Sequence, residues 1–205
     1  MAVQILSVDI YHPLREDIVA AVDVLKKGGI VVYPTGTIYG LGADIYNKEA
    51  INRILKIKKE SRQKLFSFVC GDLKEASKWA HIPNQAFRIM KRVLPGKFTF
   101  VLPASNDVPK SIIQKRRTVG IRIPDSEIAR KICEELGRPI LSTSVPKGGD
   151  DYSVDPFEIA DRYKHELNLV LACGVMPSLP STIVDFTVNP PEIIREGAGD
   201  INNLF

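Results

Sequence analysis

The chain has 205 residues, of which 44% are hydrophobic and 25% charged, a balance typical of globular proteins. It contains no apolar run of about 18 residues and no signal-peptide pattern at its start, so neither a membrane span nor a membrane partner is expected. The three cysteines and three histidines are scattered, which favours neither a disulfide framework nor a metal site built from protein side chains. A reducing cytoplasm is the simplest location.

Hydrophobic periodicity predicts alternating strands and helices along the chain. Short apolar or alternating runs predict strands at 3–10, 30–33, 65–70, 97–103, 118–124, 139–144, 167–174 and 181–186. Helical spacing, caps and breakers predict helices at 15–27, after Asn47, at 72–79, after Pro83, at 126–136 and after Asp155. No repeat or linker interrupts the pattern. We therefore expect an α+β fold: one domain over residues 1–205, helices packed on a mixed sheet, and no additional C-terminal domain.

Several predicted strand ends carry hydroxyl groups. "PTGT" follows the strand at 30–33, "STS" ends the strand at 139–144, and "PST" precedes the strand at 183–186. Open sheets bind ligands just beyond strand termini, so these residues predict a binding crevice. Arg122 stands in the middle of an alternating strand, where a buried guanidinium either pairs internally or serves a ligand. No histidine lies near a candidate nucleophile in sequence, so no side-chain nucleophile is predicted.

The glycines of "YPTGTIYGLGAD" are open to two interpretations. Gly36, Gly40 and Gly42 permit positive φ angles and close approach of the backbone to a ligand. Their spacing matches neither the dinucleotide-binding nor the P-loop motif, so a purely structural turn explains them equally well.

The formal net charge is +4, and basic residues gather at 56–64 and 115–117. Solvated surfaces are the simpler interpretation of such clusters. The alternative is contact with phosphates of a nucleotide or a nucleic-acid backbone.

Together the motifs identify a family resemblance. "YPTGTIYGLGAD", "KIKK", "PGKFTFVLP", "TVGIRIP", "LSTS", "PSTIVD" and "IIREG" occur in the order and spacing of the YrdC/YciO-like family, and the chain is most similar to its YciO branch. Family members resemble threonylcarbamoyl-AMP synthase. The resemblance implies a twisted mixed sheet with a concave basic face, and synthesis of threonylcarbamoyl-adenylate and pyrophosphate from L-threonine, bicarbonate and ATP with Mg²⁺. Its product serves tRNA modification, and family members are described as binding double-stranded RNA.

The resemblance assigns roles to individual residues. Thr35, Arg122 and Ser181 match positions that contact the threonine substrate. The nucleotide would be held by residues at five positions: Lys58, Thr118, Ser142, Ser144 and Arg195. The basic clusters supply possible contacts to RNA or tRNA: Lys59, Arg62, Lys64, Arg116 and Arg117.

Three positions depart from the family pattern. Glu60 replaces the arginine of the KxR element, although Arg62 lies nearby. Ser144 replaces the asparagine of "SAN", and Gly36 stands where many relatives have an acidic residue. Two hypotheses stay open: an adenylate-forming enzyme, and a nucleotide- or double-stranded-RNA-binding paralogue whose catalysis is lost or changed.

Overall fold

The computed structural model describes residues 3–58, 66–110, 112, 117–148, 151–202 and 204–205. Strands in this part are β1 (Gln4–Ser7), β2 (Val31–Pro34), β3 (Tyr39–Asp44), β4 (Ser67–Val69), β5 (Phe98–Pro103), β6 (Thr118–Arg122), β7 (Ile140–Ser144), β8 (Pro146–Gly148), β9 (Asp151–Tyr152), β10 (Leu169–Ala172), β11 (Thr182–Asp185) and β12 (Glu192–Arg195). Helices are α1 (Arg15–Lys26), α2 (Lys48–Ile57), α3 (Leu73–Trp79), α4 (Asn84–Val93), α5 (Glu127–Leu136) and α6 (Pro156–Arg162).

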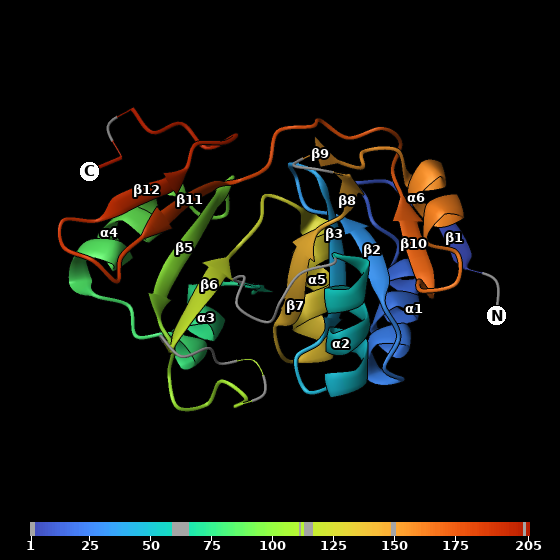
Figure 1. Ribbon diagram of the computed structural model, residues 1–205, viewed down its shortest axis with the longest axis horizontal. Coiled ribbons are helices and arrows are strands. Elements are labelled where there is room, and N and C mark those ends of the chain that lie inside the picture. Colours follow the sequence, from blue (N-terminus) through green and yellow to red (C-terminus); the bar gives the residue numbers. More distant parts are fainter. Residues whose placement is uncertain (1–2, 59–65, 111, 113–116, 149–150, 203) are drawn as a thin grey trace.

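Ten of the strands form one mixed sheet in the order β1-β10-β2-β3-β7-β4-β6-β5-β11-β12 (Figure 1). The sheet contains parallel pairs such as β10–β2 and antiparallel pairs such as β2–β3. The expected fold, helices packed on a twisted mixed sheet, is therefore confirmed.

The two sides of the sheet bury alternate residues of the same strands. On β2, Val31 and Tyr33 pack with α1 and α5, whereas Val32 packs on the other side with α2 and α6. This period of two is what a strand buried on both faces requires. A third cluster joins β5, β6 and β11 to α3 and α4.

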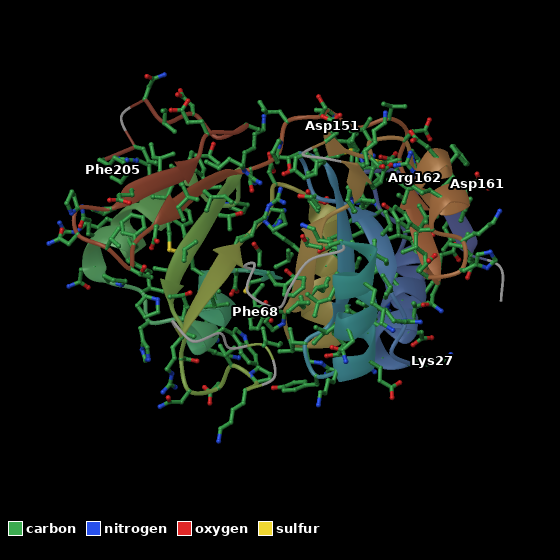
Figure 2. All side chains as sticks on the ribbon, in the orientation of Figure 1. Lys27, Phe68, Asp151, Asp161, Arg162 and Phe205 are labelled. Carbon is green, nitrogen blue, oxygen red and sulfur yellow. The ribbon has the colours of Figure 1, made fainter. Side chains whose placement is uncertain are left out.

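The three-residue strand β4 pairs with β7 on one side and β6 on the other. It thereby joins two groups of strands, β1-β10-β2-β3-β7 and β6-β5-β11-β12, into one continuous sheet. Its Phe68 is fully buried and lies near the middle of the molecule, between the two groups of strands in Figure 2. Consequently, residues from the two groups of strands come within reach of each other across β4.

Local signals place the helix ends where the sequence predicts them. Asn47 Oδ1 accepts from Ala50 N at 2.8 Å and begins α2, and Ser126 caps α5 through Ala129 N at 3.3 Å. Gly137 ends α5 in the left-handed conformation, with φ of 73°. These are standard helix-capping arrangements.

The stretch 39–44 departs from the prediction. It forms strand β3, which pairs with β2 and β7, instead of a glycine-rich loop. Among glycines 36, 40 and 42 only Gly36 uses the positive φ that the sequence permits at all three. A Cβ at Gly42 would lie 2.7 Å from Cε1 of Tyr33, which shows that this glycine makes room for a core ring. The β8–β9 hairpin was also not predicted.

Candidate functional site

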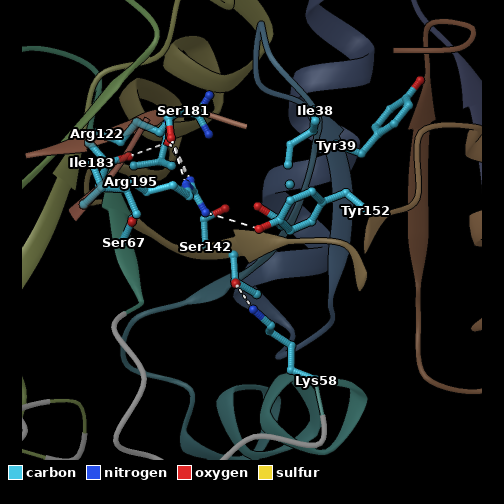
Figure 3. Close-up of a pocket in the computed structure, with 15 residues that line it drawn as sticks. Ile38, Tyr39, Lys58, Ser67, Arg122, Ser142, Tyr152, Ser181, Ile183 and Arg195 are labelled. Atoms are coloured by element: carbon cyan, nitrogen blue, oxygen red, sulfur yellow. Dashed lines mark hydrogen bonds between the residues drawn. The ribbon is translucent and has the colours of Figure 1, made fainter. Parts of the chain in front are cut away.

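A pocket of about 110 Å³ opens where the two groups of strands meet. Its polar lining residues come from β3, β4, β5, β6, β7, β9 and β12, from the position just after α2 and from the position just before β11, and few apolar side chains line it (Figure 3). The lining residues with hydroxyl or cationic groups are Tyr39, Lys58, Ser67, Thr99, Arg122, Ser142, Thr143, Ser144, Tyr152, Ser181 and Arg195.

Arg122 is the most informative of these residues. Its side chain is 8% exposed, and no carboxylate in the described part of the chain forms an ion pair with it. Nη2 donates to the Thr35 carbonyl at 3.0 Å and to Thr37 Oγ1 at 2.6 Å, while Nε is buried without a hydrogen-bond partner among the described residues. Burial lowers the pKa of the guanidinium to about 10, and the positive charge of Arg195 acts in the same direction. A buried cation with unused donors favours an anionic ligand.

The loop between β2 and β3 supports this arginine from behind. Thr35 Oγ1 donates to the Ile38 carbonyl at 2.6 Å and does not line the pocket. Gly36 has φ of 75°, and a Cβ there would lie 2.3 Å from the Asp125 carbonyl oxygen. The tight loop therefore requires glycine at this position.

Ser181 and Arg195 form the other wall of the pocket. Arg195 Nε and Nη2 donate to the Ser181 carbonyl at 3.1 and 2.7 Å, and Nη1 donates to Tyr152 Oη at 3.2 Å. The Ser181 and Thr99 hydroxyls are 2.9 Å apart. Figure 3 shows the Arg195–Tyr152 contact reaching across the pocket, from β12 to the β8–β9 hairpin.

The end of β7 supplies a row of hydroxyl groups. Tyr33 Oη donates to Ser142 Oγ at 2.7 Å, and Lys58 Nζ donates to Thr143 Oγ1 at 3.0 Å. Ser144, at the position of the family's asparagine, also lines the pocket. The row therefore places uncharged hydroxyl groups beside the Lys58 ammonium, which follows α2.

The lining residues include Lys58, Arg122 and Arg195 and no acidic residue. Such a site attracts ligands with several negative charges. Among the described residues, no group of three or more histidine, cysteine, aspartate or glutamate side chains is arranged to hold a metal ion. In the same part of the chain, no helix is long and apolar enough to cross a membrane.

The structure brings together six of the eight residues that the sequence proposed for binding threonine or the nucleotide. These six line the pocket: Lys58, Arg122, Ser142, Ser144, Ser181 and Arg195. Thr35 lies directly behind it, whereas Thr118 is at the far end of β6, paired with Pro103, and does not line it.

The proposed RNA contacts fall mostly outside the described residues, namely Lys59, Arg62, Lys64 and Arg116. Arg117 is exposed, has a positive φ of 49°, and donates to Asn106 Oδ1 at 3.0 Å.

Sequence reasoning missed Thr37, Tyr33 and Tyr152. Thr37 and Tyr33 stand in the glycine-rich motif, but their contacts with Arg122 and Ser142 join positions 85 and 109 residues apart. Tyr152 carries no motif, and only the hairpin that holds it brings it to Arg195.

Comparison with known proteins places the chain in a family. The Sua5/YciO/YrdC family model, described as "Telomere recombination", matches residues 23–197. The chain belongs to this family. Within the Sua5/YciO/YrdC family, it is 39% identical to the Escherichia coli K12 protein named "Uncharacterized protein YciO" over 192 residues, 93% of each chain. The crystal structure of E. coli YciO matches with a TM-score of 0.94 and 37% identity, covering 99% of this chain and all of that one.

Threonylcarbamoyl-AMP synthases are also related to the chain. The Pyrococcus abyssi synthase is 31% identical over 86% of this chain and 53% of its own length. A crystal structure of P. abyssi Sua5 complexed with L-threonine matches with a TM-score of 0.86 and 30% identity, covering 94% of this chain and 57% of that one. The chain thus spans little more than half of these relatives.

Proposed function

We propose that the pocket binds L-threonine, bicarbonate and ATP with Mg²⁺, and that the chain joins them to form threonylcarbamoyl-AMP and pyrophosphate. The observation that carries this proposal is Arg122, a buried guanidinium without a carboxylate partner in the described residues, facing hydroxyl groups and two further cations. The kinship with threonylcarbamoyl-AMP synthases, and the L-threonine in the P. abyssi Sua5 crystal, support the choice of substrates.

The residues divide into two ends of one pocket. Arg122, with Thr99 and Ser181 beside it, offers a guanidinium and hydroxyls suited to the carboxylate and hydroxyl of threonine. Lys58, Arg195 and the β7 hydroxyls offer donors for phosphate oxygens. Because no acidic residue lines the pocket, Mg²⁺ would be held by the phosphates and water.

The lining residues include no histidine, cysteine or carboxylate, so the chemistry rests on alignment and charge neutralisation. The threonine nitrogen forms a bond to the bicarbonate carbon, a C–O bond of bicarbonate breaks, and water leaves, which gives the carbamate. A carbamate oxygen then attacks the α-phosphorus of ATP, a new P–O bond forms, and the bond to pyrophosphate breaks. Charge that develops on the leaving pyrophosphate would be stabilised by Lys58 and Arg195.

The test is threonine- and bicarbonate-dependent release of pyrophosphate, with threonylcarbamoyl-AMP identified by mass spectrometry. Arg122→Ala should abolish turnover. Lys131→Ala should leave it unchanged, because Lys131 pairs with Glu127 on the exposed face of α5 and does not line the pocket. Absence of product from the wild-type protein at saturating substrates would refute the enzyme.

A second candidate is a binding protein for double-stranded RNA or tRNA whose catalysis is lost or changed. Two substitutions favour it, since Glu60 and Ser144 replace residues that the family uses near the triphosphate. RNA affinity should then fall steeply with salt, because phosphate contacts release counterions. Charge reversal at Arg117, Arg116 or Lys59 should weaken it, and salt-independent binding would exclude this function.

A further inference from the structure

Tyr33 is a buried tyrosine whose hydroxyl bonds a residue that lines the pocket, Ser142, on the same face of the sheet. It stands on β2, opposite Gly40 of β3, and its side chain is completely buried. A Cβ at Gly40 would lie 3.2 Å from Tyr33 Cζ, and a Cβ at Gly42 would lie 2.7 Å from Cε1. The ring therefore lies across β3 where two glycines leave space, and its hydroxyl reaches Ser142 on the next strand, β7.

The direction of this hydrogen bond follows from burial. Tyr33 Oη lies 2.7 Å from Ser142 Oγ, its only hydrogen-bond partner among the described residues. If Ser142 were the donor, the phenolic hydrogen would be buried without an acceptor, which is unfavourable. Burial also raises the pKa of Tyr33 above its ordinary value of 10, so the phenol keeps its hydrogen. Tyr33 therefore donates, and Ser142 accepts.

The consequence appears on the pocket side of β7. Because Ser142 Oγ accepts from Tyr33, its own hydrogen is free to point into the pocket that it lines. The neighbouring Thr143 is polarised in the same way, since the Lys58 ammonium can only donate to it. Both hydroxyls are thus presented as donors.

We propose that Tyr33 is a positioning residue that keeps Ser142 as a hydrogen-bond donor, so that the β7 end of the pocket selects ionised phosphate oxygens, which only accept. This inference rests on the proposed function, which places phosphate oxygens at the β7 end, and adds the residue that orients the donor there. Tyr33 acts through Ser142 and does not itself touch the ligand.

The experiment is a double-mutant cycle with Tyr33→Phe and Ser142→Ala, titrating ATP and inorganic pyrophosphate in parallel by calorimetry. Tyr33→Phe keeps the ring over Gly40 and Gly42 and removes only the oxygen. We expect each single variant to bind both ligands about 3- to 10-fold more weakly. In the Ser142→Ala background, Tyr33→Phe should change affinity less than about twofold, because the group that it orients is gone.

A buried hydroxyl elsewhere provides the control. Ser105 Oγ donates to the Lys78 carbonyl at 2.6 Å and lies outside the pocket. Ser105→Ala should lower the melting temperature without changing either affinity, which separates loss of a buried hydrogen bond from loss of orientation.

The outcomes distinguish the two proposals. If the pyrophosphate affinities change in the four proteins as expected but the wild-type protein forms no product from ATP, the synthase activity is refuted and the role of Tyr33 is supported. Equal effects of Tyr33→Phe with and without the Ser142 hydroxyl would overturn the positioning role. So would unchanged affinities in Tyr33→Phe, or failure of the wild-type protein to bind either ligand.

Discussion

Arg122 Nη2 lies 2.6 Å from Thr37 Oγ1, a contact between strand β6 and the loop that joins β2 to β3. The same nitrogen also bonds the Thr35 carbonyl, so the β2–β3 loop holds one edge of the guanidinium and leaves Nε unpaired. Gly36 lies between Thr35 and Thr37, so it affects the pocket indirectly, because these two neighbours position Arg122.

Replacing Thr37 by valine should weaken anion binding about 5- to 10-fold, because it removes one of the two acceptors that orient Arg122. Calorimetric titration with pyrophosphate and L-threonine measures the effect. Thr37→Ser keeps the hydroxyl and should restore most of the affinity. A valine variant with wild-type affinity would show that the contact has no role in binding.

Gly36→Ala should destabilise the protein by about 1–3 kcal/mol and also weaken ligand binding. An alanine at this position would have to adopt a positive φ, and its Cβ would lie 2.3 Å from the Asp125 carbonyl oxygen, so the loop that holds Arg122 must shift. Denaturant unfolding and calorimetry measure the two effects.

Gly137→Ala is the matched control for Gly36. Gly137 has φ of 73°, but nothing lies within 4 Å of a Cβ placed there. It should lower the free energy of unfolding by about 1–2 kcal/mol and leave affinity unchanged. If both variants behave alike in binding, the loop does not position the arginine.

Anion affinity should fall as pH rises through about 10, the pKa to which burial lowers Arg122. Only the protonated guanidinium attracts the ligand, so the loss is about twofold at pH 10 and about tenfold at pH 11 relative to pH 8. Circular dichroism at each pH verifies folding. The same titration on Arg122→Met should lack this step, and an identical profile in both proteins would assign the step to another group.

The free energy of unfolding should change with pH in the opposite direction to the anion affinity. Because the folded pKa of Arg122 lies below the ordinary value for arginine, keeping this group charged disfavours folding at neutral pH, and that penalty is relieved as pH rises above about 10. A bound carboxylate would remove the same penalty, so ligand should raise the melting temperature more at pH 8 than at pH 11.

Tyr152→Phe should strengthen pyrophosphate binding about 2- to 10-fold. Tyr152 Oη accepts a hydrogen bond from Arg195 Nη1 across the pocket. In the phenylalanine variant this N–H is free, so a phosphate can accept from it without first breaking the bond to Tyr152. Tyr163→Phe is the control, since Tyr163 Oη bonds the Pro146 carbonyl at 2.8 Å on the same hairpin but does not line the pocket. Weaker binding in Tyr152→Phe would show instead that this hydroxyl contacts the ligand.

Local patterns predicted most of the fold, because caps and alternation act over a few residues. Asn47, Ser126 and Gly137 mark helix ends that the structure confirms. The glycines of 39–44 misled the prediction, since glycine is typical of loops and the ring that requires them to be small lies on another strand.

The sequence by itself determined that a hydroxyl-rich strand end, an isolated strand arginine and a basic residue after α2 belong to one family's motifs. Only the tertiary structure decided that Tyr33, Thr37 and Tyr152 hold those groups, and that Thr118 lies away from them. The physical reason is range: a periodicity reports which face a residue occupies, whereas a hydrogen bond between residues 85 or 109 positions apart depends on the strand order, which local patterns do not specify.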